Sequence, residues 1–516
     1  MQLRPILAAC AALLAATGMS PVYAAESLQV VLPAALGKDA SGRLLVFAKQ
    51  GANRPEEVDS WETAPAVVSV AGRDIQTFGN ERRVTIDLDA DAAPKPFSEL
   101  PAGDYWVQVV LDPQGDYGRY GRGAGDLISN VVSIHLPLTA GARVELDHAL
   151  PPVDIWSPPN TPQFQLDWFA EARPQLADFK IPSPLLSAHA GHAVDLQAWV
   201  WVPPDYEAHG TKTWPVVYMC APFGGNYANN LRIASFISDM NKSAPTPAMI
   251  WVMLNYSTLS GATEFADSAN NGPWEKALLQ ELIPALEKKF RMDARPNGRF
   301  LMGHSSGGWA SLWLQVGHPE VFGGAWATAP DPVDFRDFVG VDLYQPGANL
   351  YFDSRGKLRP SVRRGGAPVA TQRDSVRLEE VLGHEGGSFQ SFDWVFSPGA
   401  GNGRAAPMFD RGTGAVNPTV AVYWRDHYDI SWRIEHMDAA ARRKLAGKLH
   451  ITVGDQDTFY LDGSVHKLQE VLQRTGVAAD IHFLPGKDHN NLFGSNQDPL
   501  ALLREFARAM YASARP

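Results

Sequence analysis

The chain has 516 residues, of which 45% are hydrophobic and 20% are charged, with 45 glycines and 39 prolines. This is the composition of a globular protein, and the length provides for about three units of domain size. The formal net charge of −11 argues against a nucleic-acid or anionic membrane partner, since binding to either needs a basic surface.

Residues 1–24 have the pattern of a secretory signal peptide. Arg4 is followed by an apolar run at 6–16 and then by a small-residue cleavage site that ends at Ala24. The run is shorter than the ~20 apolar residues that a membrane-spanning helix needs. We therefore expect cleavage after Ala24, a periplasmic or secreted location and no stable membrane anchor. Cleavage leaves Cys220 as the only thiol, which excludes an internal disulfide and a cysteine-based metal site.

Residues 25–150 contain short alternating runs that are separated by clusters of Gly, Pro and Asp. This pattern predicts an antiparallel β-sandwich. The region shows no nucleophile–base arrangement, so we expect an accessory domain. The expected strands are 28–32, 43–48, 84–88, 104–111 and 130–136.

The pattern changes after a Pro-rich segment at 151–175, which we predict to be a linker. From residue 176 to 516, apolar strand-like runs alternate with helical segments, which predicts a mostly parallel α/β sheet with helices on both faces. Residues 334–448 interrupt the alternation and are interpreted as an insertion near the active-site rim. The expected strands are 196–202, 215–220, 248–255, 299–302, 322–328, 449–453 and 479–484, and the clearest helices are 274–290 and the one that begins near residue 499.

The sequence Gly-His-Ser-Ser-Gly at 303–307 matches the G-x-S-x-G pattern of a hydrolase nucleophile. A predicted strand precedes it and a predicted helix follows it. Such a nucleophile sits on a sharp, strained turn, and the small residues on either side let the strand and the helix approach each other. The following helix N-terminus favours developing negative charge. These features predict Ser305 as the nucleophile.

Carboxylates and a histidine follow the later strands in the chain order that this type of nucleophile requires, namely Ser, acid, His. Asp457 lies just after the strand 449–453 and is the preferred acid, with Asp455 as the alternative. His489 lies on the loop after the strand 479–484. In this place a histidine can reach Ser305 as a general base, with the carboxylate orienting the imidazole.

An oxyanion hole needs two backbone N–H donors. Ser306 supplies the first, because it follows the nucleophile. The second is expected from the loop at 221–225, Ala-Pro-Phe-Gly-Gly. Since Pro222 has no N–H group, Phe223 is the preferred donor and Gly224 the alternative.

Two further groups of residues, a pair of histidines and three tryptophans, are weaker candidates for a functional site. His189 and His192 have the spacing of a metal-binding pair, but no third ligand is apparent, so we expect no metal and no cofactor. The tryptophans of the insertion, Trp394, Trp424 and Trp432, are candidates for lining a substrate cleft.

With these residues assembled, the chain resembles the putative-esterase branch of the α/β-hydrolases, which includes enterochelin-esterase-like and esterase-D-like proteins. The resemblance covers about residues 176–333 and 449–510. It implies the α/β-hydrolase fold and a Ser-His-Asp triad, but no particular substrate. The sequence departs from the family at 221–222, where His-Gly or Pro-Gly is usual, and the insertion 334–448 is not standard. The resemblance to the family is carried by the segments 214–218, 223–225, 281–284, 303–308, 319–323 and 486–489.

These observations predict a serine carboxylic-ester hydrolase that acts on a small-molecule ester. The alternatives are a serine peptidase of the prolyl-oligopeptidase type, an acyltransferase on the same fold, and a non-catalytic binding protein on a hydrolase scaffold. The absence of internal repeats in 25–150 argues against the peptidase, which usually carries a propeller. Intact chemistry at all three triad positions argues against the binding protein.

Overall fold

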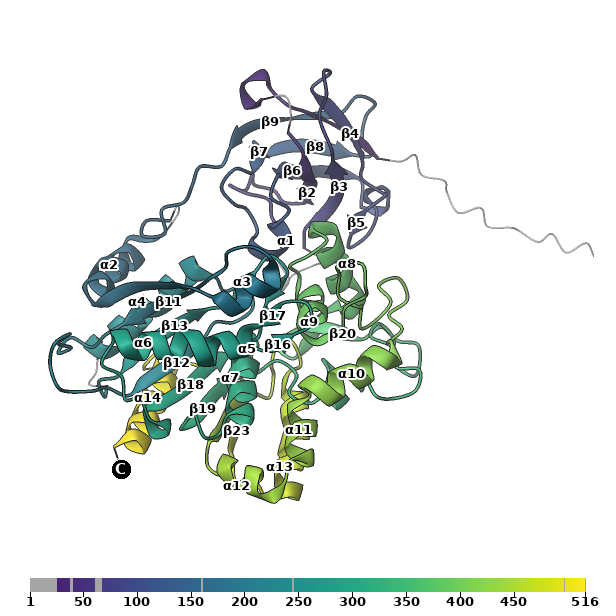
Figure 1. Ribbon diagram of the computed structural model, residues 1–516. Helices are drawn as coiled ribbons and strands as arrows, with labels where there is room; N and C mark the ends of the chain where they lie inside the picture. Colours follow the sequence, from purple (N-terminus) through teal and green to yellow (C-terminus); the bar gives the residue numbers. More distant parts are fainter. Residues whose placement is uncertain are drawn as a thin grey trace, which may run out of the picture.

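Two parts follow one another along the chain in the computed structural model (Figure 1). The first, which we call the β-region, holds the strands between residues 27 and 149. The second, which we call the sheet domain, has a large sheet with helices on both faces. The structure describes residues 26–515 except 38–39, 61–66, 159–160, 244–245 and 496, so the expected signal peptide, residues 1–24, lies outside the described residues.

The β-region is built from strands that pair into one nine-stranded network among the described residues. Most neighbours are antiparallel, but β1 and β9 pair in parallel. Alternate residues of β2 face two different apolar clusters, with Leu44 and Val46 in one and Leu45 and Phe47 in the other. Strands therefore dominate this part, while its division into two facing sheets stays a prediction. The elements are β1 (Ser27–Val31), β2 (Gly42–Lys49), β3 (Ser69–Ile75), β4 (Arg83–Asp87), β5 (Ala92–Ala93), β6 (Gly103–Asp112), α1 (Tyr117–Tyr120), β7 (Leu127–Ser129), β8 (Val132–Leu136) and β9 (Arg143–Ala149).

A helix from the later chain closes one face of the β-region. Helix α8 (Gln372–Leu382) adds Leu378 and Val381 to the apolar cluster on that face. Arg43 of β2 is 6% exposed and donates to the Val381 carbonyl from Nη2 at 2.8 Å and from Nε at 3.1 Å. Its guanidinium also pairs with Asp74 at 3.2 Å. The two parts of the molecule thus share a buried boundary.

The segment 151–175, which the sequence predicts to be a linker, is helical in its second half. Helix α2 (Gln163–Ala172) begins directly after Pro162. The ring of Trp168 packs edge-on against Phe236 of α4 (Tyr227–Ser243), with centroids 5.6 Å apart. The proline cluster ends at residue 162, and the aromatic side chains that follow gain free energy by packing on the sheet domain.

The central sheet of the sheet domain has eight strands in the order β10-β11-β13-β12-β18-β19-β22-β23. The last six in this order are parallel to one another, whereas β10 and β11 are antiparallel to their neighbours. The predicted mostly parallel sheet is confirmed, and β10 is the strand that was not predicted. The strands are β10 (Leu176–Pro182), β11 (Asp195–Trp201), β12 (Val216–Cys220), β13 (Ile250–Asn255), β18 (Arg299–His304), β19 (Gly324–Thr328), β22 (Leu449–Gly454) and β23 (Asp480–Leu484).

Helices cover both faces of this sheet, as Figure 1 shows. On β12, Val217 belongs to the cluster that contains α4 and α14 (Ala501–Ala514). Val216 and Tyr218 belong to the cluster on the other face, with α6 (Ile283–Lys289), α7 (Ser306–Gly317) and α13 (Asp462–Thr475). No helix among the described residues is long and apolar enough to cross a membrane. The other α-helices and strands of this part are α3 (Pro184–Ala190), β14 (Ser257–Thr258), β15 (Gly261–Ala262), β16 (Asp267–Ser268), β17 (Gly272–Pro273) and α5 (Trp274–Ala277), and the π-helix Leu278–Leu282 joins α5 to α6.

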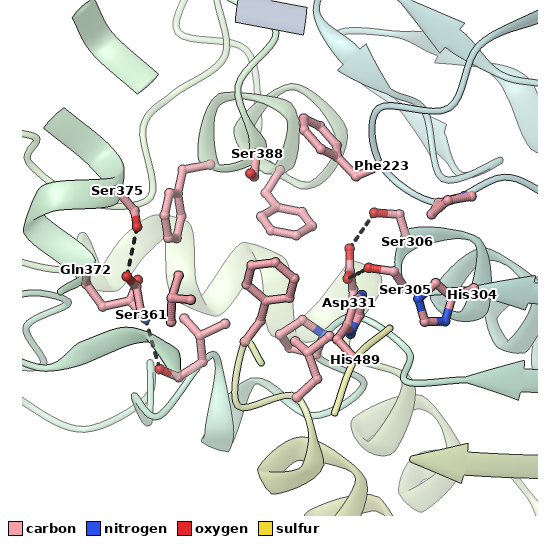
Figure 2. Close-up of a pocket in the computed structure, with 18 of the residues that line it drawn as sticks. Phe223, His304, Ser305, Ser306, Asp331, Ser361, Gln372, Ser375, Ser388 and His489 are labelled. Carbon is pink, nitrogen blue, oxygen red and sulfur yellow. Dashed lines mark hydrogen bonds between the residues drawn. The ribbon is translucent and has the colours of Figure 1, made fainter. Parts of the chain in front are cut away.

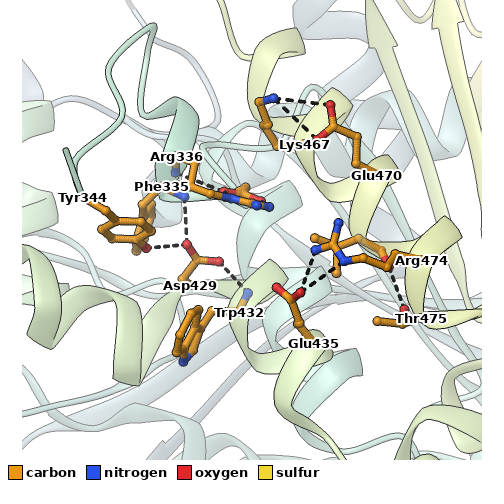
Figure 3. A network of polar contacts seen from close by, with 12 residues as sticks. Phe335, Arg336, Tyr344, Asp429, Trp432, Glu435, Lys467, Glu470, Arg474 and Thr475 are labelled. Atoms are coloured by element: carbon orange, nitrogen blue, oxygen red, sulfur yellow. Dashed lines mark hydrogen bonds and ion pairs between the residues drawn. The ribbon is translucent and has the colours of Figure 1, made fainter.

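The inserted segment, residues 334–448, lies between β19 and β22 and is tied together at a buried carboxylate (Figure 3). Asp429 is 2% exposed and accepts hydrogen bonds from the Tyr344 hydroxyl at 2.5 Å, the Phe335 amide at 2.9 Å and the Trp432 amide at 2.8 Å. Burial, and then the nearby charge of Asp334, raise the pKa of Asp429. Besides α8, the segment contains β20 (Pro360–Arg364), β21 (Ala367–Thr371), α9 (Ser388–Phe396), α10 (Pro418–Tyr428), α11 (Ile430–His436) and α12 (Ala439–Leu445).

Candidate active site

Ser305 occupies the turn between β18 and α7. Its φ of 56° and ψ of −124° are rarely adopted by a residue with a side chain, and such strain concentrates at functional sites. The flanking glycines make the turn feasible. A Cβ at Gly303 would collide with the Gly307 carbonyl, and a Cβ at Gly307 would collide with the Cys220 carbonyl. The predicted strand–turn–helix around Ser305 is therefore present.

His489 and Asp457 meet on the loops that follow β23 and β22. His489 Nδ1 lies 2.8 Å from Asp457 Oδ2, and both side chains are buried. Asp457 Oδ1 accepts from the amides of Phe459 at 2.9 Å and Leu461 at 3.2 Å. Burial alone would raise the pKa of Asp457, but its interactions with His489 and with these two N–H groups outweigh burial and lower it. The carboxylate is thus held in its charged form beside the imidazole.

Asp455, the alternative acid, has a different partner. Its Oδ1 accepts from the Gly486 amide at 2.7 Å. This bond joins the loop after β22 to the turn after β23, close to the point where the Gln456 amide donates to the Lys487 carbonyl at 3.0 Å. The geometry therefore gives Asp455 a part in holding the two loops together and brings Asp457 to the histidine.

A second carboxylate lies next to the nucleophile. Asp331 accepts from the Ser305 hydroxyl at 3.1 Å and from the Ser306 hydroxyl at 2.6 Å. The buried side chain of Glu264 is close enough that Asp331 adds to the effect of burial in raising the pKa of Glu264. Sequence reasoning missed Asp331, although it follows β19 by three residues and so shares the strand-end signal that singled out the other site residues.

The loop at 221–225 lies beside this turn. Gly225 donates its amide to the Pro222 carbonyl at 2.9 Å, and Gly224 has a φ of 80° that glycine adopts without strain. Phe223 and Ser306 lie on the same cavity as Ser305. The structure thus brings together the two residues that the sequence proposes as oxyanion donors.

Ser305 and His489 open onto a cavity of about 290 Å³. Figure 2 shows Ser361, Gln372 and Ser375 of the inserted segment across this cavity from Ser305. At that end Ser361 and Ser375 form a hydroxyl pair at 2.8 Å. The rest of the wall is mainly apolar and is supplied by Pro222, Phe223, Val339, Val362, Phe389, Phe392, Phe459 and Leu461.

Phenylalanines, and not the predicted tryptophans, line this cavity. Trp424 is 1% exposed, and its indole donates to Ser397 Oγ at 2.8 Å inside the inserted segment. Trp394 and Trp432 are also absent from the cavity wall. The expectation that these three line the cleft is wrong, and for Trp424 the reason is that its large side chain fills the core of the inserted segment.

The histidines at 189 and 192 contact separate backbone carbonyls. His189 Nε2 lies 3.1 Å from the Asn270 carbonyl, and His192 Nδ1 lies 3.1 Å from that of Ala193. Among the described residues, no group of three or more His, Cys, Asp or Glu side chains is arranged to hold a metal ion. Cys220 is buried at the end of β12, and burial raises the pKa of its thiol to about 12.

A family model described as Putative esterase matches residues 193–497, which is more than half of the chain and includes the turn at Ser305 and both loops that carry Asp457 and His489. The chain belongs to this esterase family. The predicted resemblance is therefore confirmed. The protein is an esterase of the α/β-hydrolase superfamily, and its substrates are esters.

Similar solved structures include other esterases at low identity. A ferulic acid esterase shares 13% identity with this esterase at a TM-score of 0.40, covering 66% of this chain and 99% of the other. An S-formylglutathione hydrolase from Agrobacterium tumefaciens shares 15% at 0.38, covering 66% and 94%. Fluorophosphonate-binding serine hydrolase F from Staphylococcus aureus shares 14% at 0.37, covering 66% and 99%. No curated protein matches the chain.

Proposed function

We propose that this esterase hydrolyses carboxylic esters through a Ser305–His489–Asp457 triad and an acyl-enzyme intermediate. The observation that carries the proposal is the 2.8 Å contact between His489 Nδ1 and Asp457 Oδ2, formed where His489 and the strained Ser305 face one cavity. With Nδ1–H directed at Asp457, the other ring nitrogen, Nε2, is free of a proton and is able to accept one.

In the acylation step Ser305 Oγ attacks the ester carbonyl carbon, and His489 Nε2 takes the hydroxyl proton. The Ser305 hydroxyl donates to Asp331 in the resting structure, so its hydrogen turns to His489 before attack. The amides of Phe223 and Ser306 receive the oxyanion of the tetrahedral intermediate. When the C–O bond breaks, His489 returns the proton to the departing alcohol.

In the deacylation step water replaces the alcohol. His489 Nε2 takes a proton from the water, whose oxygen attacks the acyl carbon, and the proton then passes to Ser305 Oγ as the acid leaves. The cavity volume is near the lower limit of about 300 Å³ for small-molecule pockets. Its phenylalanine wall favours an ester with an apolar acyl or alcohol group.

We also propose that residues 1–24 direct export to the periplasm or the medium, which the order of Arg4, apolar run and small residues supports. The mass of the mature chain tests this, since cleavage leaves Ala25 first. Residues 25–150 are proposed as a β-sandwich domain. Their strands and two apolar clusters support this proposal.

Covalent labelling tests the proposed nucleophile. A fluorophosphonate should add one phosphonyl group to the purified mature enzyme, and peptide mapping should place it on Ser305, because the activated hydroxyl attacks phosphorus and fluoride leaves. The same sample should hydrolyse p-nitrophenyl acetate or butyrate.

Absence of the adduct, or an adduct on another serine, would contradict this mechanism. Turnover of peptide amides without turnover of esters would support a peptidase instead. Product that shifts mainly from acid to ester when an alcohol is added would support an acyltransferase. Heat-denatured enzyme serves as the control for non-specific labelling.

The acid side of the pH profile depends on which histidine of the site changes charge. His304 packs against His489 with ring centroids 4.4 Å apart. Burial, and then the neighbouring His489, lower the pKa of His304 to about 3, so His304 is neutral at higher pH. His304 therefore keeps the same charge over the working range and adds no second proton to the acid side of the profile.

We therefore expect kcat/KM to fall about tenfold per pH unit on the acid side, which is the slope for one proton. The measurement is hydrolysis of a p-nitrophenyl ester from pH 4 to pH 8 in buffers of constant ionic strength. A fall of a hundredfold per unit would show that a second group titrates as well.

A further inference from the structure

Helix α1 of the β-region reaches the loop that carries Phe223. Arg119 of this helix is only 5% exposed. Its Nη2 donates to Ser257 Oγ at 3.0 Å and to the Gly225 carbonyl at 3.4 Å. The guanidinium carbon lies 4.7 Å from the centroid of the Phe223 ring. One side chain from the β-region thus contacts the loop at two points, the ring of Phe223 and the carbonyl of Gly225.

This loop has few contacts of its own that fix its conformation. Two adjacent glycines follow Phe223, and glycine restricts the backbone less than any other residue. The polar contacts within and next to the loop include the Gly225 amide to Pro222 carbonyl bond at 2.9 Å and the bond from the Asn229 side chain to the Gly224 carbonyl at 3.2 Å. At the start of the loop, the Tyr256 hydroxyl donates to the Ala221 carbonyl. Contacts from outside the loop therefore have a large share in deciding where the Phe223 amide lies.

The surroundings of Arg119 are unusual for an arginine that serves stability alone. Its Nε and Nη1 are buried and have no hydrogen-bond partner among the described residues. Burial lowers the pKa of Arg119, and the nearby Tyr120, Tyr256 and Glu264 oppose that effect. Buried donors without partners reduce stability. A buried cation next to an oxyanion loop, however, strengthens the binding of negative charge in a site from which water is excluded.

We propose that Arg119 is a positioning residue for the ester hydrolysis proposed above, on which this inference rests. It holds the Phe223–Gly225 loop so that the Phe223 amide meets the oxyanion, and its charge adds to the field there. The β-region is accordingly part of the catalytic unit of this esterase. It is not an independent accessory domain.

The test compares Arg119→Met with Tyr120→Phe. Tyr120 is the neighbouring residue of α1, and its hydroxyl lies 2.9 Å from the same Ser257 Oγ, but its hydrogen bonds go to Ser257 and Thr258 and not to the loop at 221–225. Arg119→Met should lower kcat by about 10-fold to 100-fold, which is less than the 10²–10³-fold cost of losing an oxyanion donor. KM should change little. Tyr120→Phe should keep the kcat of the wild type.

A second readout separates positioning from general damage to the fold. Each variant is given an ester and the matching thionoester, in which sulfur replaces the carbonyl oxygen. Because sulfur accepts hydrogen bonds weakly, a well-placed oxyanion hole prefers the ester. The ratio of the two kcat/KM values should fall in Arg119→Met and should match the wild type in Tyr120→Phe.

The outcomes distinguish this inference from the proposed function. An inactive and unlabelled wild-type enzyme would overturn the ester-hydrolase mechanism itself. An active wild type together with an unchanged kcat and ester-to-thionoester ratio in Arg119→Met would overturn only the role of Arg119. If circular dichroism shows that Arg119→Met is unfolded, Arg119→Lys takes its place, since one ammonium group cannot both stack on Phe223 and reach Gly225. An unchanged ratio in that variant would equally overturn the role.

Discussion

Replacing Ser305 with alanine is expected to lower kcat for ester hydrolysis by about 10⁴-fold or more. The change removes the hydroxyl that we propose forms the acyl-enzyme, while the amide of Ser306 and the loop with Phe223 stay in place. Alanine also removes the bond from Ser305 Oγ to Asp331, but Ser306 still donates to that carboxylate at 2.6 Å. The variant should therefore remain folded and should take up no fluorophosphonate.

A matched serine on the helix that follows Ser305 provides the control. Ser311 is fully buried on α7 and donates its hydroxyl to the Gly307 carbonyl at 2.7 Å, outside the cavity. Ser311→Ala should keep covalent labelling and most of the turnover, at a cost to stability of about 1 kcal/mol for the lost hydrogen bond. The measurement is steady-state hydrolysis of p-nitrophenyl esters together with thermal unfolding. Turnover by Ser305→Ala within tenfold of the wild type would rule out Ser305 as the nucleophile.

Replacing Asp457 with asparagine is expected to lower kcat by about 10⁴-fold. The amide of asparagine would donate to His489 Nδ1, which places the ring proton on Nε2 and leaves that nitrogen unable to accept from Ser305. Asparagine also lacks the charge that stabilises the imidazolium. Because the substitution is nearly isosteric, and the remaining amide oxygen can still accept from Phe459 and Leu461, the loop should keep its shape.

Asp455→Asn is the matched control, two residues away on the same loop. Asparagine retains an oxygen that accepts from the Gly486 amide, so activity should stay within a few-fold of the wild type. Measuring both variants on the same ester settles which carboxylate serves the histidine. A large loss in Asp455→Asn with little loss in Asp457→Asn would reverse our assignment.

Sequence patterns predicted the interior of the sheet better than its edge. Buried parallel strands such as β12 and β18 are continuous apolar runs, which is the strongest strand signal. Strand β10 was missed because it lies at the edge, pairs only with β11, and has a mixed sequence with Lys180 and Pro182 at its end. Helix α2 was missed because it directly follows a cluster of prolines, which favours a linker, and because it is stabilised by packing on α4.

Within the site, the residues that the sequence can predict are those that directly follow a strand of the central sheet. Ser305, Asp457 and His489 each follow a recognisable strand, and Asp331 was available from the same reasoning. Arg119 could not be predicted in this way, since it belongs to a four-residue helix far away in the sequence, and only tertiary packing brings it to the loop. The phenylalanines that the inserted segment adds to the cavity wall, Phe389 and Phe392, were hidden for the same reason, because they lie on helix α9, outside the central sheet whose strand ends place the other site residues.

The buried boundary between β2 and α8 has a consequence for the design of chimeric enzymes. Helix α8 carries Gln372 and Ser375 of the cavity wall on one side and Val381, the acceptor for Arg43, on the other. A graft that swaps residues 334–448 alone would leave the Arg43 guanidinium buried without its carbonyl partner, which is destabilising. A chimera meant to change the substrate preference should therefore exchange two sequence blocks together, the amino-terminal strands and the segment that shapes the pocket.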